Sequence, residues 1–239
     1  VFGGLHATVC TDEARQHFDS VVVGEGEAVW PELLDDAQRG ELKPVYRAAE
    51  NGKSKSWPMP RYDLLGRNPP RFTIQTQRGC PLACEFCGAS RLLGKFHEKP
   101  LENIRAELAA ICGISRSPLI ELADDNTFAG SRDAGELLAA FKDSRARWFT
   151  EADWRIGERD EVLSGLAESG CVQVLMGIES LVFRYPGMGE KQAELARIMA
   201  AVERIQDSGV AVNGCFIVGA DGETPQSLAR LVRFILDSP

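Results

Sequence analysis

Three closely spaced cysteines, Cys80, Cys84 and Cys87, constrain this chain more than any other feature of its sequence. They are separated by three residues and then by two, so their thiolates can close on a single soft metal centre. On a four-iron cluster, three thiolates hold three irons and leave the fourth iron without a protein ligand. That open iron can bind a substrate or a cofactor, and the loop therefore predicts a reactive site.

Two structural explanations account for the three cysteines less well. A structural zinc site needs four nitrogen or sulfur ligands, but the next cysteine is the isolated Cys112, with only His97 between. A disulfide framework is typical of small secreted domains with paired cysteines, whereas this longer chain has seven. The other four are scattered and are expected to be buried or incidental thiols: Cys10, Cys112, Cys171 and Cys215.

The composition indicates a soluble globular protein. The 239 residues are 44% hydrophobic, enough to bury a sizeable core. A formal net charge of −8, without a run of Lys or Arg, gives no signal for nucleic acid or an anionic membrane. No apolar run approaches the roughly 18 residues of a membrane-spanning helix, and no leader pattern opens the chain. Clustered reduced thiols favour a cytoplasmic location.

Residues 1–40 predict the closing part of an open α/β sheet. A strand leads into Gly3 and Gly4, and a second strand over 18–23 leads into Gly24 and Gly26. Ligands of such sheets bind at the carboxyl ends of strands, where glycine lets the backbone approach them closely. Turns that only allow helices to pack on strands explain the same glycines. Helices are expected over 12–17 and 28–39.

Prolines and small polar residues predict an extended connector over 41–70, pinned to the core by Trp57 and Tyr62. From residue 71 onward, strand and helix patterns alternate, which predicts a parallel sheet with right-handed crossovers. Five strand–helix units are expected, with strands over 71–76, 118–123, 148–153, 172–178 and 210–218 and helices over 101–112, 132–143, 159–169, 190–207 and 225–237.

Polar residues follow the predicted strands, at the end of a parallel barrel where chemistry gathers. Asp124 and Asp125 follow the second strand, Glu151 belongs to the end of the third, and Glu179 and Ser180 end the fourth. Helix capping explains the two aspartates as well as a functional role does. For Glu179 we favour function, because it follows an apolar strand and precedes an irregular stretch.

The cysteine loop resembles the cluster loop of the radical SAM superfamily, in its spacing, in Phe86 before the third cysteine and in the preceding Arg78-Gly79. Residues 174–180 and 216–224 are similar to that family's fourth-strand and fifth-strand motifs. The resemblance covers residues 71–239 and implies a partial (β/α)6 barrel. Five units of this barrel are visible, and the core is expected to be truncated before the sixth, as the N-terminal domain is truncated before Val1.

The resemblance implies a [4Fe-4S] cluster on the three cysteines and S-adenosylmethionine on the open iron. Reductive cleavage of S-adenosylmethionine would give a 5′-deoxyadenosyl radical, with the electron supplied by a flavodoxin or ferredoxin. This sequence has Leu-Ala-Asp-Asp where the family often has Gly-Gly-Glu for the amino group. The implied cofactor-binding residues are Phe86, Asp124, Asp125, Glu151, Glu179, Ser180, Ile217 and Gly219; no catalytic residue is assigned.

Residues 1–40 resemble the C-terminal part of the cobalamin-binding domain that precedes many radical SAM cores. The resemblance rests on the Gly-Gly turn and the Gly-Glu-Gly-Glu loop, and it implies cobalamin near Gly3, Gly4, Gly24 and Gly26. The family's Asp-x-His-x-x-Gly motif is not in this sequence. His6 lies outside such a motif and is interpreted as an ordinary loop histidine.

Together these resemblances favour a cobalamin-dependent enzyme that methylates or remodels an unactivated carbon of a small molecule or peptide. Two alternatives stay open: cobalamin-independent hydrogen abstraction, and a non-catalytic iron–sulfur or zinc module. A methylthiotransferase is less well supported, because that group carries a second cysteine triad in its front domain and only Cys10 precedes the loop here.

Overall fold

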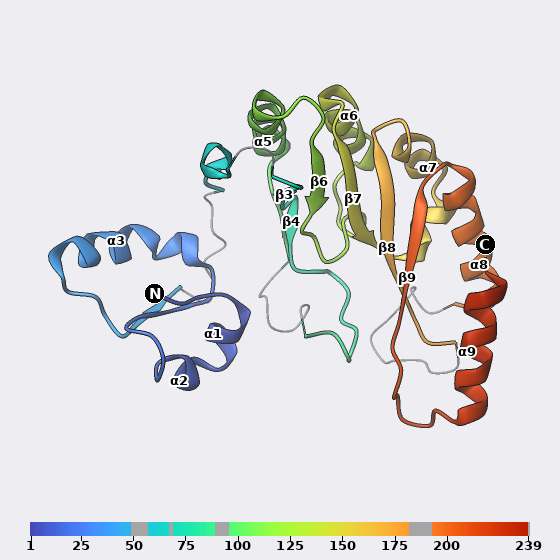
Figure 1. Cartoon of the computed structure of the whole chain (residues 1–239), viewed down its shortest axis with the longest axis horizontal. Coiled ribbons are helices and arrows are strands. Elements are labelled where there is room, and N and C mark those ends of the chain that lie inside the picture. Colours follow the sequence, from blue (N-terminus) through green and yellow to red (C-terminus); the bar gives the residue numbers. More distant parts are fainter. Residues whose placement is uncertain (49–56, 67–68, 89–95, 182–192, 239) are drawn as a thin grey trace.

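The computed structural model describes residues 1–48, 57–66, 69–88, 96–181 and 193–238. A small N-terminal lobe lies beside a larger curved sheet that has helices along its outside (Figure 1). Within the described residues this sheet has five strands, all parallel, in the order β3-β6-β7-β8-β9. The strands are β3 (Phe72–Ile74), β6 (Leu119–Leu122), β7 (Arg147–Ala152), β8 (Cys171–Glu179) and β9 (Ala211–Phe216).

A helix follows each of these strands, which confirms the five predicted strand–helix units and the open, barrel-like α/β fold. The helices are α5 (Leu101–Ile114), α6 (Ala134–Ser144), α7 (Asp160–Leu166), α8 (Leu195–Asp207) and α9 (Pro225–Asp237). The first residues expected in the fourth helix, 190–192, lie outside the described residues. None of the described helices has the length and apolar character needed to cross a membrane.

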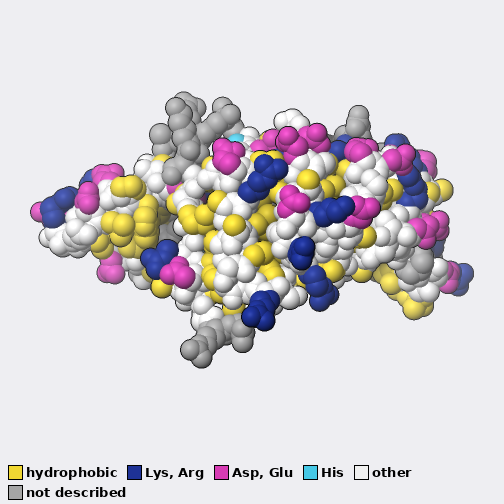
Figure 2. Space-filling model, turned by 90° about the horizontal axis from the view of Figure 1, so that it is seen from above, with side chains coloured by type: hydrophobic (Ala, Val, Ile, Leu, Met, Phe, Trp, Pro, Cys, Tyr) yellow, Lys and Arg dark blue, Asp and Glu magenta, His cyan; other side chains and the backbone are white. Residues whose placement is uncertain are grey.

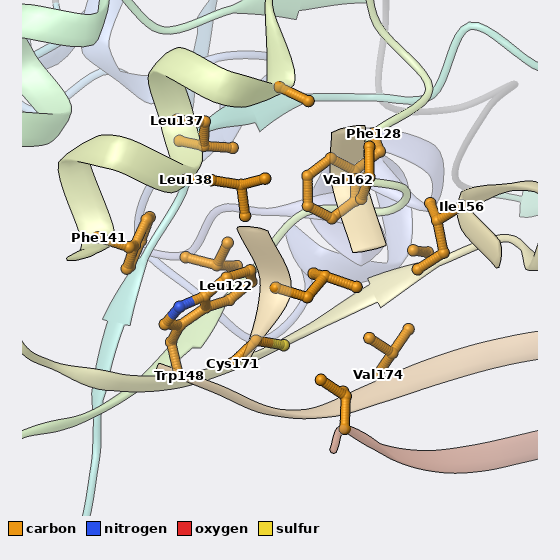
Figure 3. Close-up of a cluster of buried hydrophobic side chains, with 14 of the residues drawn as sticks. Leu122, Phe128, Leu137, Leu138, Phe141, Trp148, Ile156, Val162, Cys171 and Val174 are labelled. Atoms are coloured by element: carbon orange, nitrogen blue, oxygen red, sulfur yellow. The ribbon is translucent and has the colours of Figure 1, made fainter. Parts of the chain in front are cut away.

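The main core lies between the sheet and its helices (Figure 3). Trp148 of β7 is fully buried against Phe141 of α6, with the ring centroids 4.9 Å apart. Its indole nitrogen donates a hydrogen bond to the carbonyl of Ser169 at 2.9 Å, so the one polar atom of this side chain is satisfied. Burial of apolar surface on this scale stabilises the sheet and fixes its carboxyl edge.

Local signals set the helix ends. In α9, Pro225 occupies the first turn, and the hydroxyls of Thr224 and Ser227 form a reciprocal capping box. In α6, the Asp133 carboxylate accepts the backbone N–H of Gly135 at 2.7 Å. These caps satisfy amide groups that the helices cannot pair internally.

The N-terminal lobe is a small parallel sheet with helices α1 (Leu5–Val9), α2 (Thr11–Ala14) and α3 (Trp30–Arg39). Strand β1 (Val21–Val23) pairs with β2 (Val45–Arg47), and Phe2 bridges to Val21 on the other side. The structure therefore differs from the sequence-based prediction at two places. The first helical region begins at Leu5 instead of residue 12 and is divided into α1 and α2, and the range expected as connector, 41–70, contains β2.

Strand β2 forms because its central side chain has a partner in the lobe. Tyr46 is buried, and its hydroxyl donates to the Asp36 carboxylate of α3 at 2.8 Å. This contact joins residues ten positions apart, and a three-residue strand carries too little periodicity to be recognised in the sequence.

A second short ladder was also not predicted. Strand β4 (Gln77–Arg78), directly before the cysteine loop, pairs antiparallel with β5 (His97–Glu98). The two strands thus hold the two ends of the segment that contains the loop. Residues 89–95 of that segment lie outside the described residues.

Trp57 and Tyr62 pin the connector to the core, as expected. The carbonyl of Trp57 accepts the side-chain amide of Asn103 on α5 at 3.4 Å. The Tyr62 hydroxyl donates to the buried carboxylate of Glu107 at 2.8 Å, and burial together with this neighbouring charge raises the pKa of Tyr62. Glu107 in turn pairs with Lys99 at 2.6 Å, with both side chains 5% exposed or less.

Replacing Glu107 by Ala is expected to destabilise the protein by about 3–5 kcal/mol, because it leaves Lys99 buried without a counter-charge. Urea unfolding of the variant measures this loss. Arg105→Ala, at an exposed position of the same helix, is the control and should change the free energy of unfolding by less than about 0.5 kcal/mol. Joint replacement of Lys99 by Met and Glu107 by Leu should recover most of the loss; a single variant as stable as the wild type would contradict this role.

Candidate active site

A cavity of about 370 Å³ opens at the carboxyl ends of the sheet strands. Its wall combines the cysteine loop with the ends of β7, β8 and β9 and with the residues that follow β6. In parallel α/β folds, loops at this edge can converge on one ligand from several strands. Seven of the fifteen residues that the sequence nominated line this cavity: Cys80, Cys84, Phe86, Cys87, Asp125, Glu151 and Glu179.

The start of the cysteine loop is tied to the sheet by Asp124, which is 3% exposed. One carboxylate oxygen accepts the backbone N–H groups of Thr76 at 2.7 Å and Gln77 at 3.2 Å. The other accepts the hydroxyl groups of Thr76 and Thr127. The contacts with Thr76 and Gln77 join the exit of β3 to the exit of β6, so Asp124 fixes the direction in which the loop leaves the sheet.

Because of this network, the two adjacent aspartates have different surroundings. Asp124 turns into the protein and does not line the cavity, whereas Asp125 does. The sequence nominated both for cofactor binding, and the structure brings only Asp125 to the cavity wall.

The three cysteines of the loop all line this cavity. Cys84 is 5% exposed and packs with Leu82, Ile217 and Cys87, while Cys80 and Cys87 are half-buried. The contact with Ile217 brings the cysteine loop against the exit of β9. Burial raises the pKa of the Cys80 thiol, and the neighbouring acid Asp125 acts in the same direction. A bound metal would reverse this preference by holding the thiolate.

The distance between the thiol sulfur atoms indicates whether they could bind a single metal ion or a cluster. Zinc bound by sulfur at about 2.3 Å keeps its ligands roughly 3.8 Å apart. In the part of the chain that the structure describes, the three metal-type donors that lie within 4.8 Å of one another are those of His6, Cys10 and Glu13. At least one pair of the loop thiols is therefore more than 4.8 Å apart, which is wider than the ligand separation at a single zinc ion and is compatible with a cluster of several iron atoms.

Carboxyl groups also line the cavity: those of Asp125, Glu151, Asp153 and Glu179. Burial raises the pKa of Asp125. Burial and then the charge of Asp125 raise the pKa of Glu151. Asp153 behaves differently: burial alone would raise its pKa, but hydrogen bonds from Arg155 and Asn126 lower it. Asp153 is thus held as a paired carboxylate, while Asp125 and Glu151 are destabilised as anions, an arrangement that favours a bound cation.

Glu179 has an unusual backbone conformation. It ends β8 with a φ of 69°, which places a non-glycine residue in the left-handed region, and the pairing with β9 shifts in register there. Its carbonyl accepts the N–H of Ile217 at 2.7 Å, and its side chain lines the cavity. Such a conformation costs on the order of 1–3 kcal/mol and is common at functional sites, so Glu179 remains a candidate ligand-binding residue.

The other nominated residues lie away from the cavity wall. Ser180 is buried beside Glu179, and Gly219 donates its N–H to the Glu223 carboxylate at 2.6 Å. The four glycines of the N-terminal lobe are brought together with each other. Gly3 and Gly4 follow Phe2, and Gly24 and Gly26 follow β1. The N–H of Gly24 donates to the hydroxyl of Thr8 in α1 at 3.0 Å, and this hydroxyl donates to the carbonyl of Gly4 at 2.8 Å.

Sequence reasoning missed several residues of the cavity wall. Asn126 and Asp153 follow nominated acids, and they bond to each other at 2.9 Å. Cys215 lies on β9, where side chains of alternate residues face the same side; that period could have placed it on the cavity. A larger cavity of about 560 Å³ lies beyond Asp153, but its Arg155 and Arg197 are ion-paired with Asp153 and Glu158.

Replacing Glu151 by Gln is expected to raise the free energy of unfolding at pH 8. Because its folded pKa is raised, the native state binds more protons than the unfolded state, and stability falls as the pH rises from the ordinary value of about 4 through the raised value. The gain should be small, since Glu151 is exposed, and should vanish near pH 4.

Glu158→Gln serves as the control of opposite sign. The hydrogen bond from Arg197 lowers the pKa of Glu158, so this variant should lose stability at pH 8. Urea unfolding at several pH values tests both variants, and a destabilised Glu151→Gln protein at pH 8 would contradict the repulsion described here.

Comparison with known proteins assigns a family to this arrangement. Residues 74–235 match the model described as the radical SAM superfamily. The bacteriochlorophyllide d C-12(1)-methyltransferase of Chlorobaculum tepidum is 28% identical over 100% of this chain and 54% of that protein. The chain thus spans about half the length of that relative.

Solved structures share the fold at low sequence identity. The cobalamin-dependent S-adenosylmethionine radical enzyme OxsB, with aqua-cobalamin bound, aligns with 97% of this chain and 38% of its own, with a TM-score of 0.73 and 18% identity. The radical S-adenosylmethionine methyltransferase TsrM from Kitasatospora setae, with cobalamin and a [4Fe-4S] cluster bound, aligns with 70% of this chain and 34% of its own, with a TM-score of 0.59 and 18% identity. Since the family model covers more than half of the chain, this protein belongs to the radical SAM superfamily of enzymes.

Proposed function

We propose that this chain is the central part of a cobalamin-dependent radical SAM methyltransferase. The observation that carries the proposal is the common cavity, on which the three thiols of the cysteine loop and four carboxyl groups converge at the carboxyl edge of the sheet. The N-terminal lobe adds support, because the alignment with cobalamin-bound OxsB covers 97% of this chain and so includes the lobe. The Chlorobaculum tepidum relative is itself named a methyltransferase.

Cys80, Cys84 and Cys87 would hold a [4Fe-4S] cluster as thiolates. When bound, the cluster and S-adenosylmethionine supply the one-electron chemistry that gives a 5′-deoxyadenosyl radical, and cobalamin supplies methyl transfer. Three protein thiolates match a cluster that leaves one iron open. An electron donor of the flavodoxin or ferredoxin type, in a reducing cytoplasm, completes the proposed system.

The carboxylates of the cavity suit S-adenosylmethionine, whose sulfonium is cationic and whose amino group, bound to the open iron as the neutral amine, can still donate hydrogen bonds. Asp125, Glu151 and Glu179 line the same cavity as the thiols. Burial raises the pKa of Asp125 and Glu151, and a cation bound beside them would lower it again by stabilising their ionised forms. These residues would bind and orient the cofactor.

The remaining wall is apolar and would keep water away from reactive species. Leu82 and Phe86 come from the loop, and Leu175 and Met176 come from β8. Phe86 is 37% exposed at the cavity, where its ring can pack on an adenosyl group. Exclusion of water limits side reactions of a radical.

Charged side chains of both signs are interspersed over the face shown in Figure 2. Together with the net charge of −8, this distribution gives no support for a nucleic-acid substrate. The proposal therefore concerns a small molecule or a peptide with an unactivated carbon.

Anaerobically reconstituted full-length protein, reduced with dithionite, should convert S-adenosylmethionine to 5′-deoxyadenosine and methionine and should bind cobalamin. Chromatography of the products measures the cleavage of S-adenosylmethionine, and the absorption spectrum of the desalted protein measures the bound cobalamin. Cleavage without retained cobalamin would support cobalamin-independent hydrogen abstraction instead. If the protein binds iron but does not cleave S-adenosylmethionine, a non-catalytic module is supported. If it binds no iron, the proposal is refuted.

Replacing any one of Cys80, Cys84 and Cys87 by Ser should lower the bound iron from about four atoms per chain to a small fraction, because a cluster with an open iron has no spare thiolate. Cys215→Ser is the matched control, since it lies on the same cavity but outside the loop, and should keep its iron. Iron analysis and the absorption spectrum measure both. Equal loss from the Cys215 variant would contradict the assignment of ligands.

A further inference from the structure

The base of the cysteine loop is attached to the N-terminal lobe by one arginine. Arg78 donates two hydrogen bonds to the carboxylate of Glu27, at 2.7 and 3.2 Å, and lies 3.3 Å from the carboxylate of Glu25. Both acids belong to the Gly-Glu-Gly-Glu loop that follows β1. Arg78 is two residues before Cys80 in the chain, so the lobe is joined to the cluster loop almost at its first ligand.

These contacts are shielded from water. The side chains of Arg78 and Glu25 are 18% and 17% exposed, and that of Glu27 is 25% exposed. The Trp57 ring covers the guanidinium, whose carbon lies 5.1 Å from the ring centroid. A bidentate, partly buried pair of this kind is stronger and better defined in direction than a surface ion pair. Burial would raise the pKa of Glu27, but the hydrogen bonds from Arg78 lower it, so the pair is held ionised.

His97, at the other end of the segment that contains the cysteine loop, lies close to Glu25, which Arg78 also contacts. Arg78 and His97 are paired residues of β4 and β5. The His97 Nε2 atom lies 3.6 Å from Glu25, and the His97 ring lies 5.4 Å from that of Trp57. The Gly-Glu-Gly-Glu loop thus contacts both strands that enclose the cysteine loop.

We propose that Arg78, with Glu25 and Glu27, forms an interlobe joint that sets the distance between the N-terminal lobe and the cluster loop, and that Arg78 is therefore a positioning residue for methyl transfer. This inference rests on the proposed function, in which the lobe and the loop hold the two groups that must cooperate. Neither acid lines the cavity. The joint acts on geometry between the lobes and leaves the cluster ligands unchanged.

Arg78→Met tests the joint in the full-length protein, with Arg78→Lys as the conservative variant and Arg71→Met as the matched control. Arg71 pairs with Glu121 within the barrel, away from the lobe. The first readout is amide hydrogen exchange in peptides that contain residues 24–28 and 77–79. Loss of the charged hydrogen bonds should speed their exchange by about tenfold in Arg78→Met, less in Arg78→Lys, and not in the control.

The second readout is the ratio of 5′-deoxyadenosine to methylated product. Arg78→Met should keep its iron and its cluster signal, yet raise this ratio by about tenfold or more, because small misplacements of reacting groups strongly slow transfer. Arg78→Lys should restore part of the coupling. Unchanged exchange and an unchanged ratio would overturn the proposal, and so would a loss of iron in parallel with activity.

The two readouts separate this proposal from the proposed function. If the wild type forms no methylated product, the proposed function fails, and hydrogen exchange still decides whether the joint exists. If methylation proceeds in the wild type and Arg78→Met neither loosens the loop nor uncouples the products, the joint fails alone.

Discussion

The carboxylate of Asp124 holds the exits of two strands together, and the site is built on that contact. It accepts two backbone N–H groups and two hydroxyl groups in a buried position. A buried carboxylate is stable only with such a full set of partners, so residues 76, 77 and 127 have little freedom. The loop that carries Cys80, Cys84 and Cys87 begins directly after this point and is thereby directed over the open end of the sheet.

The sheet and the lobe contribute in different ways to the same site. The sheet is rigid because a continuous apolar core packs against it, and its strands present acids at one edge. The lobe has a much smaller core, and its Gly-Glu-Gly-Glu loop meets the cysteine loop through charged side chains. An ionic contact at such a boundary can fix the orientation of the lobe relative to the sheet, and it does not need the large apolar contact area of a core. The glycines of that loop allow its turn, while its glutamates make the contact.

Much of the fold could be predicted because the barrel strands are apolar runs and the helices carry an apolar face. The short strands were harder to predict. In the lobe, β2 depends on the contact of Tyr46 with Asp36, and beside the cysteine loop β4 and β5 have two residues each, so none of the three has a periodic signal. In the site, the cysteines, Asp125, Glu151 and Glu179 were expected at one edge because parallel strands end there. That Asp124 turns inward while Asp125 faces the cavity depends on the hydroxyls of Thr76 and Thr127, which no local pattern reveals.

The central claim is that the three-thiol loop leaves one iron open to S-adenosylmethionine within this cavity. Electron–nuclear double resonance on the reduced cluster tests it most directly, with S-adenosylmethionine carrying ¹⁵N in the amino group or ¹⁷O in the carboxylate. The account predicts hyperfine coupling of both labels to the cluster, because both groups would bind the open iron. A reduced cluster that shows no coupling to either label, in protein that retains S-adenosylmethionine, would contradict it.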